Sequence, residues 1–297
     1  MTAPVKLKDI LEKTTNFFRE KDFDSPRLDA ELLLAKALGL RRIDLYLKYD
    51  QPLASSEVDM CREIVRRRSK GEPVAYILGQ KEFYGLNFFV DNNVLIPRPE
   101  TELLVEAVVT AFKKTHQELG QRNDEKIDIL DLGCGSGCIG LSLTHLLKNT
   151  QTQLVDISEA ALAMTKKNAE NLKLSDQCEF TCTDAATQSF AGKFFDIIVA
   201  NPPYISKDDL RVQKEVLEFE PHQALFSGQD GLEANFSWSK NLISHLKTKG
   251  IMCFEFGIDQ GEHVRQHFIN LGVFSTVSII KDLSGIDRHV LAIRKDS

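Results

Sequence analysis

The sequence predicts an α/β protein in which a small helical domain precedes a Rossmann-like domain with a seven-stranded sheet. From residue 127 onward, short apolar runs alternate with helical segments, which is typical of a parallel sheet covered on both faces. A glycine-rich stretch follows the first apolar run, where open α/β sheets bind ligands. Before residue 72, apolar residues recur at helical spacing instead.

The composition is that of a soluble globular protein with room for two domains. The 297 residues are 42% hydrophobic and 27% charged, and their net charge is −6. Proteins that bind nucleic acids usually carry a basic excess, so no nucleic-acid substrate is expected. No signal peptide or membrane span is recognisable, which predicts a cytoplasmic protein, expected to be a monomer. The six cysteines lack CxxC spacing, so no metal site is predicted.

Residues 1–71 are expected to form the helical domain. Apolar residues between positions 7 and 18 fall on one face of a helix. A second helix begins at Ser25-Pro26, with serine as the N-cap and proline in the first turn, and it ends at Gly39. A third helix begins at Ser55 or Ser56.

Residues 72–96 are predicted to link the two domains through a β-hairpin. The segment 83–89 has the character of a strand, and the polar residues 91–93 would turn it into a short second strand. Pro97 and Pro99 break this pattern, so the Rossmann-like domain is taken as residues 97–297.

The elements of the second domain follow from its apolar runs. We expect strands at residues 127–131, 153–156, 178–182, 195–200, 251–256, 274–280 and 289–293, with helices between most of them. The link between the last two strands is short, so this pair should be antiparallel.

The loop after the first strand, in "ILDLGCGSGCIGLSL", is a candidate ligand site. Its glycines let a ligand approach the backbone closely, and Asp156 lies about 20 residues after Gly135, as in dinucleotide-binding folds. The loop alone therefore permits NAD. Asp131 argues against NAD because its charge would repel a pyrophosphate, whereas it suits the ammonium of S-adenosyl-L-methionine. Asp156 would then bind the ribose, and Asp184 the adenine amino group.

"NPPYIS", residues 201–206, closes the fourth apolar run with groups suited to hold a planar amide. Neither proline can donate to a sheet, so Asn201 is held at the strand end. The Asn201 side-chain oxygen and the Pro202 carbonyl can accept the two N–H bonds of an amide, while Pro203 fixes their direction. Tyr204 can lie against the amide plane and exclude water.

Together with this loop, the motifs of the chain resemble those of the HemK/PrmC family. The similar segments are "IPRPETE" (96–102), "DLGCGSGCIGLSL" (131–143), "VDIS" (155–158), "NPPYIS" (201–206), "FEPHQALFSGQDGLE" (219–233) and "DLSGIDRHVLA" (282–292). The resemblance implies a class I methyltransferase fold. It also implies that S-adenosyl-L-methionine donates a methyl group, leaving S-adenosyl-L-homocysteine, to the side-chain nitrogen N5 of the glutamine in the GGQ motif of class I peptide-chain release factors.

The resemblance also implies the roles of individual residues. The expected catalytic residues are Asn201, Pro202, Pro203 and Tyr204, joined in substrate binding by Arg98 and Thr101, with Glu102 close by. The expected cofactor residues are Asp131, Gly133, Cys134, Gly135, Ser136, Gly137, Asp156, Ile157, Asp184, Ala185 and Asn201. The chain departs from the family at Ser227, at Gln229 and at Ala185, where some members have an aromatic residue over the adenine. The helical domain would dock the release factor.

Other features are expected to be structural. Trp238 is interpreted as core packing and His222 and His289 as surface residues, while Arg41-Arg42 and Arg66–Arg68 are taken as solvated helix faces.

Two rival functions remain open on the sequence. A DNA adenine methylase shares the NPPY loop, but it needs a basic groove and a target-recognition domain that the acidic chain and its short helical part do not offer. A non-catalytic cofactor-binding or ribosome-associated module is the other rival, and the intact NPPY loop argues against it.

Overall fold

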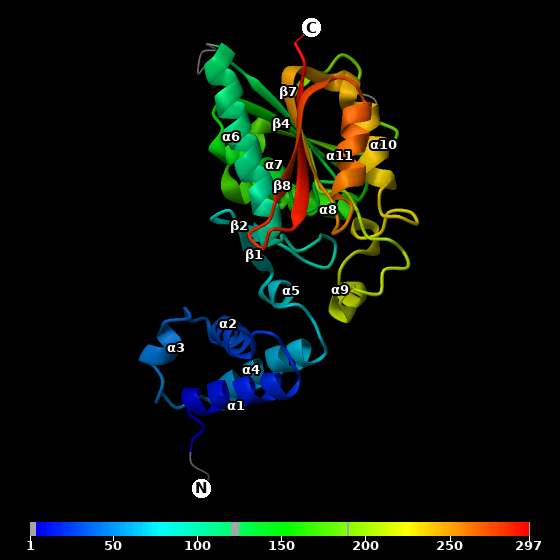
Figure 1. Ribbon diagram of the computed structural model, residues 1–297. Helices are drawn as coiled ribbons and strands as arrows, with labels where there is room; N and C mark the ends of the chain where they lie inside the picture. Colours follow the sequence, from blue (N-terminus) through cyan, green and yellow to red (C-terminus); the bar gives the residue numbers. More distant parts are fainter. Residues whose placement is uncertain (1–3, 120–124, 189, 297) are drawn as a thin grey trace. The chain divides into compact units, whose positions relative to one another are not determined.

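The computed structural model describes residues 4–119, 125–188 and 190–296, which form two compact units (Figure 1). The first unit consists of Met1–Gln80 and Lys214–Phe219, and the second of Lys81–Gln213 and Glu220–Ser297. Within the described residues, no helix has both the length and the apolar character to cross a membrane.

The described part of the first unit consists mainly of helices. Its helices are α1 (Leu7–Glu20), α2 (Pro26–Leu38), α3 (Asp44–Leu47), α4 (Ser55–Ser69), α5 (Val74–Leu78) and α9 (Lys214–Phe219). Ser25 occupies the N-cap of α2, and Gly39 ends it in the left-handed conformation at φ 62°. The third predicted helix begins at Ser55, but its N-cap is Ala54, whose backbone N–H donates to Glu57 at 2.8 Å.

The first unit extends beyond the predicted boundary at residue 71. Ile77 of α5 is buried in the same core as Leu11 and Phe18 of α1, so α5 packs with the helices before it. The linker expected at residues 72–96 therefore begins with a helix of this unit.

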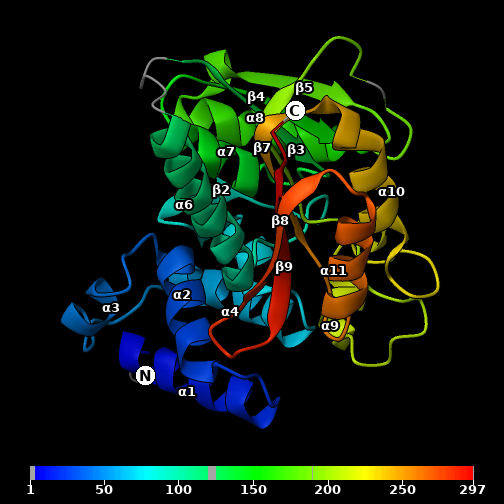
Figure 2. The same cartoon turned by 45° about the horizontal axis from the view of Figure 1, so that its top comes forward.

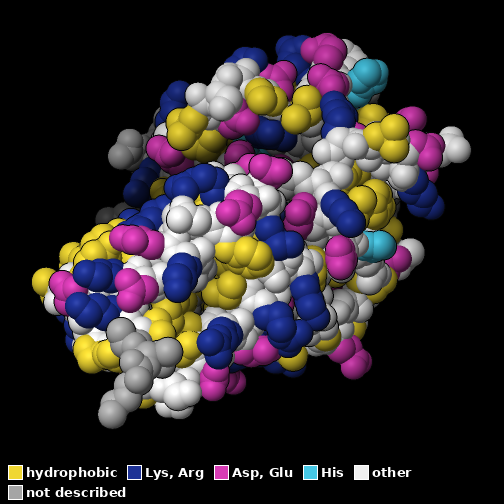
Figure 3. Space-filling model, turned by 90° about the horizontal axis from the view of Figure 1, so that it is seen from below, with side chains coloured by type: hydrophobic (Ala, Val, Ile, Leu, Met, Phe, Trp, Pro, Cys, Tyr) yellow, Lys and Arg dark blue, Asp and Glu magenta, His cyan; other side chains and the backbone are white. Residues whose placement is uncertain are grey.

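The arginine clusters of the first unit are paired with acids rather than left free. Arg42 donates to Glu31 at 2.6 Å, and Arg68 donates to Asp29 at 2.9 Å. Arg41, Arg66 and Arg67 likewise form ion pairs. Figure 3 shows Lys and Arg side chains interspersed with Asp and Glu side chains. The charges of these arginines are therefore partly offset by neighbouring carboxylates.

The second unit begins with a two-stranded hairpin whose turn differs from the predicted one. Strands β1 (Gln80–Phe83) and β2 (Leu86–Phe89) pair, and Tyr84 and Gly85 between them both have positive φ, 50° and 73°. Two consecutive residues with positive φ form a type I′ turn, whose twist matches that of the two flanking strands. The predicted turn at residues 91–93 was wrong, because the strand-like run 83–89 itself contains the turn.

The remaining strands form one sheet. They are β3 (Ile127–Leu132), β4 (Thr150–Asp156), β5 (Cys178–Cys182), β6 (Phe195–Ala200), β7 (Leu246–Glu255), β8 (Phe274–Lys281) and β9 (Asp287–Arg294). Their order is β5-β4-β3-β6-β7-β9-β8. The first five strands pair in parallel, whereas β9 runs antiparallel to both β7 and β8, which confirms the prediction for the last pair.

Helices cover both faces of this sheet. They are α6 (Glu102–Leu119), α7 (Cys138–Leu146), α8 (Glu159–Leu172), α10 (Glu233–Leu242) and α11 (Gly261–Asn270), with short 3₁₀ helices η1 (Pro99–Thr101), η2 (Ser175–Gln177), η3 (His222–Ala224) and η4 (Ile243–His245). Figures 1 and 2 show α6 on one side of the strands and α10 with α11 on the other.

Successive strand residues contribute to two separate cores, as strand geometry requires. Ile129 and Ile197 pack with α6, α7 and α8, while Leu130 and Ile198 pack with α10 and α11. Burial on both faces explains why the central strands are predominantly apolar.

Candidate active site

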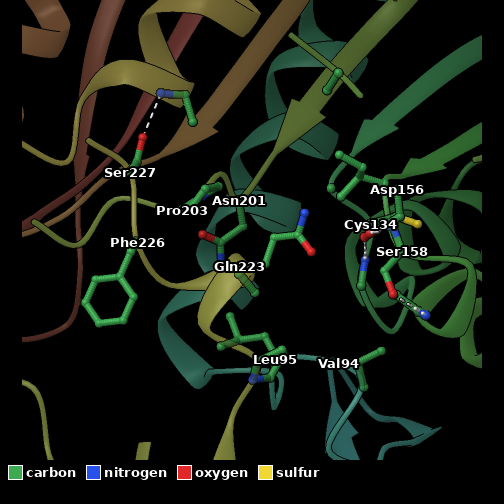
Figure 4. A pocket seen from close by; sticks show the side chains of 18 of the residues that line it. Val94, Leu95, Cys134, Asp156, Ser158, Asn201, Pro203, Gln223, Phe226 and Ser227 are labelled. Atoms are coloured by element: carbon green, nitrogen blue, oxygen red, sulfur yellow. Dashed lines mark hydrogen bonds between the residues drawn. The ribbon is translucent and has the colours of Figure 1, made fainter. Parts of the chain in front are cut away.

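A pocket of about 550 Å³ lies in the second unit at the carboxyl ends of β3, β4 and β6. Gly133 follows β3, Asp156 ends β4 and Asn201 follows β6, and all three residues line the pocket. Figure 4 shows Asp156 on one side of it and Asn201 with Pro203 toward the other. The volume suits a ligand of a few hundred daltons, and the position is where open α/β sheets bind ligands.

The glycine loop adopts a backbone that favours glycine. Gly133, Gly135 and Gly137 have φ of 61°, 56° and 79°, in the left-handed region. A Cβ on Gly137 would lie 2.7 Å from Thr165 Cγ2, and one on Gly133 would lie 3.0 Å from the Trp238 ring. The loop therefore presents its backbone to the pocket without side chains in the way.

Asp131 lies beneath the glycine loop, and its carboxylate is incompletely satisfied. Its Oδ2 accepts the Gly140 N–H at 2.8 Å, but the buried Oδ1 has no hydrogen-bond partner. Burial raises the pKa of Asp131 to about 7, opposed by the Gly140 N–H and assisted by the charge of Asp156. Asp131 is 1% exposed and does not itself line the pocket.

Asp156 ties the glycine loop to the end of β4. Its Oδ2 accepts the Gly135 N–H and its Oδ1 accepts the Ser158 N–H, both at 2.9 Å. Burial raises the pKa of Asp156, and these N–H donors oppose the rise. Each carboxylate oxygen can accept a further hydrogen bond, so Asp156 can bind hydroxyl groups of a ligand.

Most of the other predicted cofactor residues line the same pocket. Cys134, Ser136, Ile157, Asp184 and Ala185 do so, whereas Gly137 does not and serves as the N-cap of α7.

The NPPY loop contributes only part of its residues to the pocket. Asn201 and Pro203 line it, while Pro202 is buried and Tyr204 is outside the lining. The Asn201 Nδ2 donates to Thr101 Oγ1 at 3.5 Å. The Tyr204 hydroxyl is directed away, donating to Glu255 Oε1 at 3.2 Å.

Glu255, at the end of β7, joins several of these groups and was not singled out in the sequence. It is 2% exposed, and its Oε2 accepts from Thr101 Oγ1 at 2.7 Å and lies 3.3 Å from His289 Nε2. His289 is fully buried in β9, so its prediction as a surface residue was wrong. An acid inside the apolar run "IMCFEF" is the sequence signal for this cluster.

The segment 219–233 supports the NPPY loop. Ile205 and Phe226 form a parallel bridge, in which the Ile205 N–H donates to the Leu225 carbonyl at 2.9 Å. A Cβ on Gly231 would lie 2.2 Å from the Tyr204 carbonyl oxygen, so only glycine fits there.

The predicted substrate residues differ in their placement. Arg98 and Thr101 line the pocket, and Arg98 is ion-paired with the buried Glu220. Glu102 does not line it; its carboxylate accepts the Tyr84 N–H at 3.0 Å and so anchors the hairpin.

Trp238 has a second role besides packing. It packs against the core between the sheet and α10, as predicted, but it also lines the pocket beside Gly133 and Ala185. An isolated tryptophan in an amphipathic helix carries no sequence signal for a ligand site.

Two family models match this chain. The model of the PrmC N-terminal domain matches residues 9–79, and the model of the methyltransferase small domain matches residues 102–228. Among solved structures, the catalytic domain of hMettl16 in complex with MAT2A 3′UTR hairpin 6 has a TM-score of 0.56 at 14% identity, covering 75% of this chain and 82% of that one. Identity this low establishes a common fold only.

Curated relatives match over nearly the whole chain. The release factor glutamine methyltransferase of Rhodopirellula baltica is 39% identical, covering 99% of this chain and 97% of that protein. The protein of the same name from Chlorobaculum tepidum is also 39% identical, covering 94% of each.

Proposed function

The chain belongs to the family of release factor glutamine methyltransferases, and we propose that it methylates the N5 amide nitrogen of a glutamine in class I peptide-chain release factors. The methylated residue is the glutamine of the GGQ motif. The observation that carries this proposal is the juxtaposition of Asp156 and Asn201 in one pocket, one suited to a nucleoside and the other to a planar amide.

The pocket suits S-adenosyl-L-methionine. Asp156 in its lining suits the hydroxyl groups of such a ligand, and the unpartnered oxygen of Asp131, buried beneath the glycine loop, favours a cation nearby. When bound, S-adenosyl-L-methionine would supply an electrophilic methyl carbon to the amide nitrogen. Its sulfur would keep the electron pair of the broken bond, and the proton lost by the nitrogen would pass to solvent.

The residues around the pocket have distinct tasks toward this ligand. The Asp156 carboxylate accepts from the ribose hydroxyl groups while it holds the Gly135 N–H. Ile157, Ala185 and Trp238 form apolar walls for the adenine, and Trp238 provides the aromatic surface that Ala185 lacks. Asp184, which also lines the pocket, is assigned to the adenine amino group.

Asn201 prepares the amide for attack. An amide nitrogen is a weak nucleophile because its lone pair is delocalised into the carbonyl group. Acceptors that hold both N–H bonds in a fixed direction favour the geometry in which the lone pair faces the methyl carbon. The Asn201 side-chain oxygen and the Pro202 carbonyl provide these acceptors, and the Pro203 ring limits the space around them.

The helical unit recognises the folded release factor. Its short helix α3 exposes Leu47 at 75% and Tyr46 at 46%, and Ile43 before it is 57% exposed. Exposed apolar side chains gathered on one short segment are a common feature of protein-binding surfaces. Leu47→Ser should raise the KM for intact release factor and leave methylation of a short Gly-Gly-Gln peptide unchanged.

Labelled S-adenosyl-L-methionine tests the proposed substrate. The protein is incubated with release factor, with release factor whose GGQ glutamine is replaced by alanine, or with plasmid DNA. We expect label only in the unaltered release factor. Label in the DNA would favour an adenine methylase, and label in the alanine-substituted release factor would show that another residue is methylated.

A further inference from the structure

The carboxylate of Glu255 is buried beside the groups that contact Asn201. Thr101 Oγ1 lies 2.7 Å from Glu255 Oε2 and 3.5 Å from Asn201 Nδ2, so the threonine hydroxyl stands between the acid and the amide. Thr101 is 2% exposed, and Glu255 is equally buried. Asn201 and Thr101 line the pocket, whereas Glu255 does not.

Donor and acceptor counting fixes the direction of this chain of contacts. The Thr101 hydroxyl donates its single hydrogen to Glu255 Oε2. Toward Asn201 the same hydroxyl can then only accept. The Asn201 atom that faces Thr101 must therefore be the nitrogen, and the Asn201 oxygen is turned away from Thr101.

We propose that Glu255 is a positioning residue that acts through Thr101 to fix the orientation of the Asn201 amide. With the nitrogen held by Thr101, Oδ1 is the atom left to accept an N–H of the target amide. The reversed amide would present N–H donors to the N–H groups of the substrate and could not hold it. This inference rests on the proposed function, because it assigns an acceptor role to Asn201.

The other neighbours of Glu255 reinforce its role as an acceptor. The Tyr204 hydroxyl donates to Oε1, and His289 Nε2 lies 3.3 Å from Oε2, across the β7–β9 pair. Burial and the adjacent Glu255 raise the pKa of Tyr204, so its hydroxyl keeps its proton and remains a donor. Three potential donors thus converge on one carboxylate, whose two oxygens can accept from all of them.

Two isosteric substitutions test the chain of contacts. Glu255→Gln keeps the shape but adds an NH₂ group that can donate to Thr101, which frees the threonine hydrogen to point at Asn201 and reverse its amide. Thr101→Val removes the hydroxyl. Each should lower the single-turnover rate of methyl transfer about 10²-fold, the loss seen when one preorganised contact is removed. Thr101→Ser, which keeps the hydroxyl, should retain most of the transfer rate that Thr101→Val loses.

Cofactor affinity separates positioning from general damage. The Kd for S-adenosyl-L-methionine, measured by calorimetry, should change less than about threefold in Glu255→Gln, since Glu255 does not line the pocket. The matched control is Glu262→Gln on α11, whose side chain is 77% exposed and which should leave both rate and affinity unchanged. A fall in rate and in affinity together would assign Glu255 a merely structural role.

A double-mutant cycle tests whether Glu255 acts through Asn201. In an Asn201→Ala background, Glu255→Gln should have almost no further effect, because there is no amide left to orient. If the rate losses of the two single variants multiply in the double variant, the two residues act independently and the inference is overturned.

A measurement without substrate keeps this inference distinct from the proposed function. In the parent protein, nuclear Overhauser contacts should connect the Asn201 side-chain N–H protons with the Thr101 side chain, and Glu255→Gln should abolish them. Persistence of these contacts in Glu255→Gln would refute the orientation role even if release factor is methylated. If the contacts behave as expected but no release factor is methylated, the proposed function fails and the hydrogen-bond assignment stands.

Discussion

Relative to the parent protein, Asp131→Asn should gain more stability at neutral pH than at acidic pH. In the parent, Oδ2 is held by the Gly140 N–H and Oδ1 has no partner in a site that is 1% exposed. An asparagine oxygen can keep the Gly140 contact. The substitution therefore removes mainly the cost of a buried, ionised carboxylate.

The size of this effect follows from the pKa. Burial raises the pKa of Asp131 from 3.8 to about 7, a difference of about 3 at ~1.4 kcal/mol per unit. Between these values the folded state binds the proton that the unfolded state has released, so stability falls as pH rises through this window. Above pH 7 the cost reaches about 4 kcal/mol, and from pH 5 to pH 8 it grows by about 2.5 kcal/mol.

Urea unfolding at pH 5 and pH 8 measures this difference. Trp238 is the only tryptophan and lies in the second unit, so its fluorescence reports on the unit that contains Asp131. The stability difference between Asp131→Asn and the parent should rise by about 2.5 kcal/mol from pH 5 to pH 8, whatever constant cost the new NH₂ group adds. Parallel behaviour of the two proteins across this range would refute the reasoning.

Substitutions at Asn201, Asp156 and Gly231 also have defined outcomes. Asn201→Ala should reduce the single-turnover rate of methyl transfer about 10²-fold, and a parental rate would refute the role given to Asn201. Asn201→Asp should bind S-adenosyl-L-methionine more tightly but transfer the methyl group more slowly than the parent. Asp156→Ala should weaken S-adenosyl-L-methionine binding by about 2–3 kcal/mol in calorimetry, and unchanged affinity would contradict the ribose assignment. Gly231→Ala should slow methyl transfer and destabilise the protein by more than about 2 kcal/mol, because its Cβ would clash with the Tyr204 carbonyl. The control is Gly272→Ala, where φ is 74° and no atom lies within 4 Å of the new Cβ. It should destabilise the protein by only about 1–2 kcal/mol. Equal effects of the two glycine substitutions would show that the contact is unimportant.

The features visible in the sequence are those with local causes. The central strands are buried on both faces, so Ile127–Leu132 and Phe195–Ala200 are predominantly apolar and do not alternate strictly with polar residues. The glycine loop and the prolines after Asn201 restrict the backbone by their own chemistry, which is why both ends of the pocket could be predicted.

Two of the missed features depend on residues distant in the chain, whereas the third has a local cause. Glu255 and His289 are neighbours only because β7 pairs with β9, and no local sequence pattern predicts their contact. Helix α9 joins the first unit although it lies between β6 and β7 in the sequence; Phe219 packs near Gly71. The hairpin turn was misplaced because Tyr84 adopts a positive φ that tyrosine seldom takes.

The most direct test of the proposed activity is to locate the added methyl group by tandem mass spectrometry. Release factor is incubated with S-adenosyl-L-methionine and either the parent protein or Asn201→Ala, and its peptides are then sequenced. The account predicts one added methyl group on the side-chain nitrogen of the GGQ glutamine with the parent protein, and about 10²-fold slower appearance with Asn201→Ala. A methyl group on any other residue, or equal rates with both proteins, would contradict it.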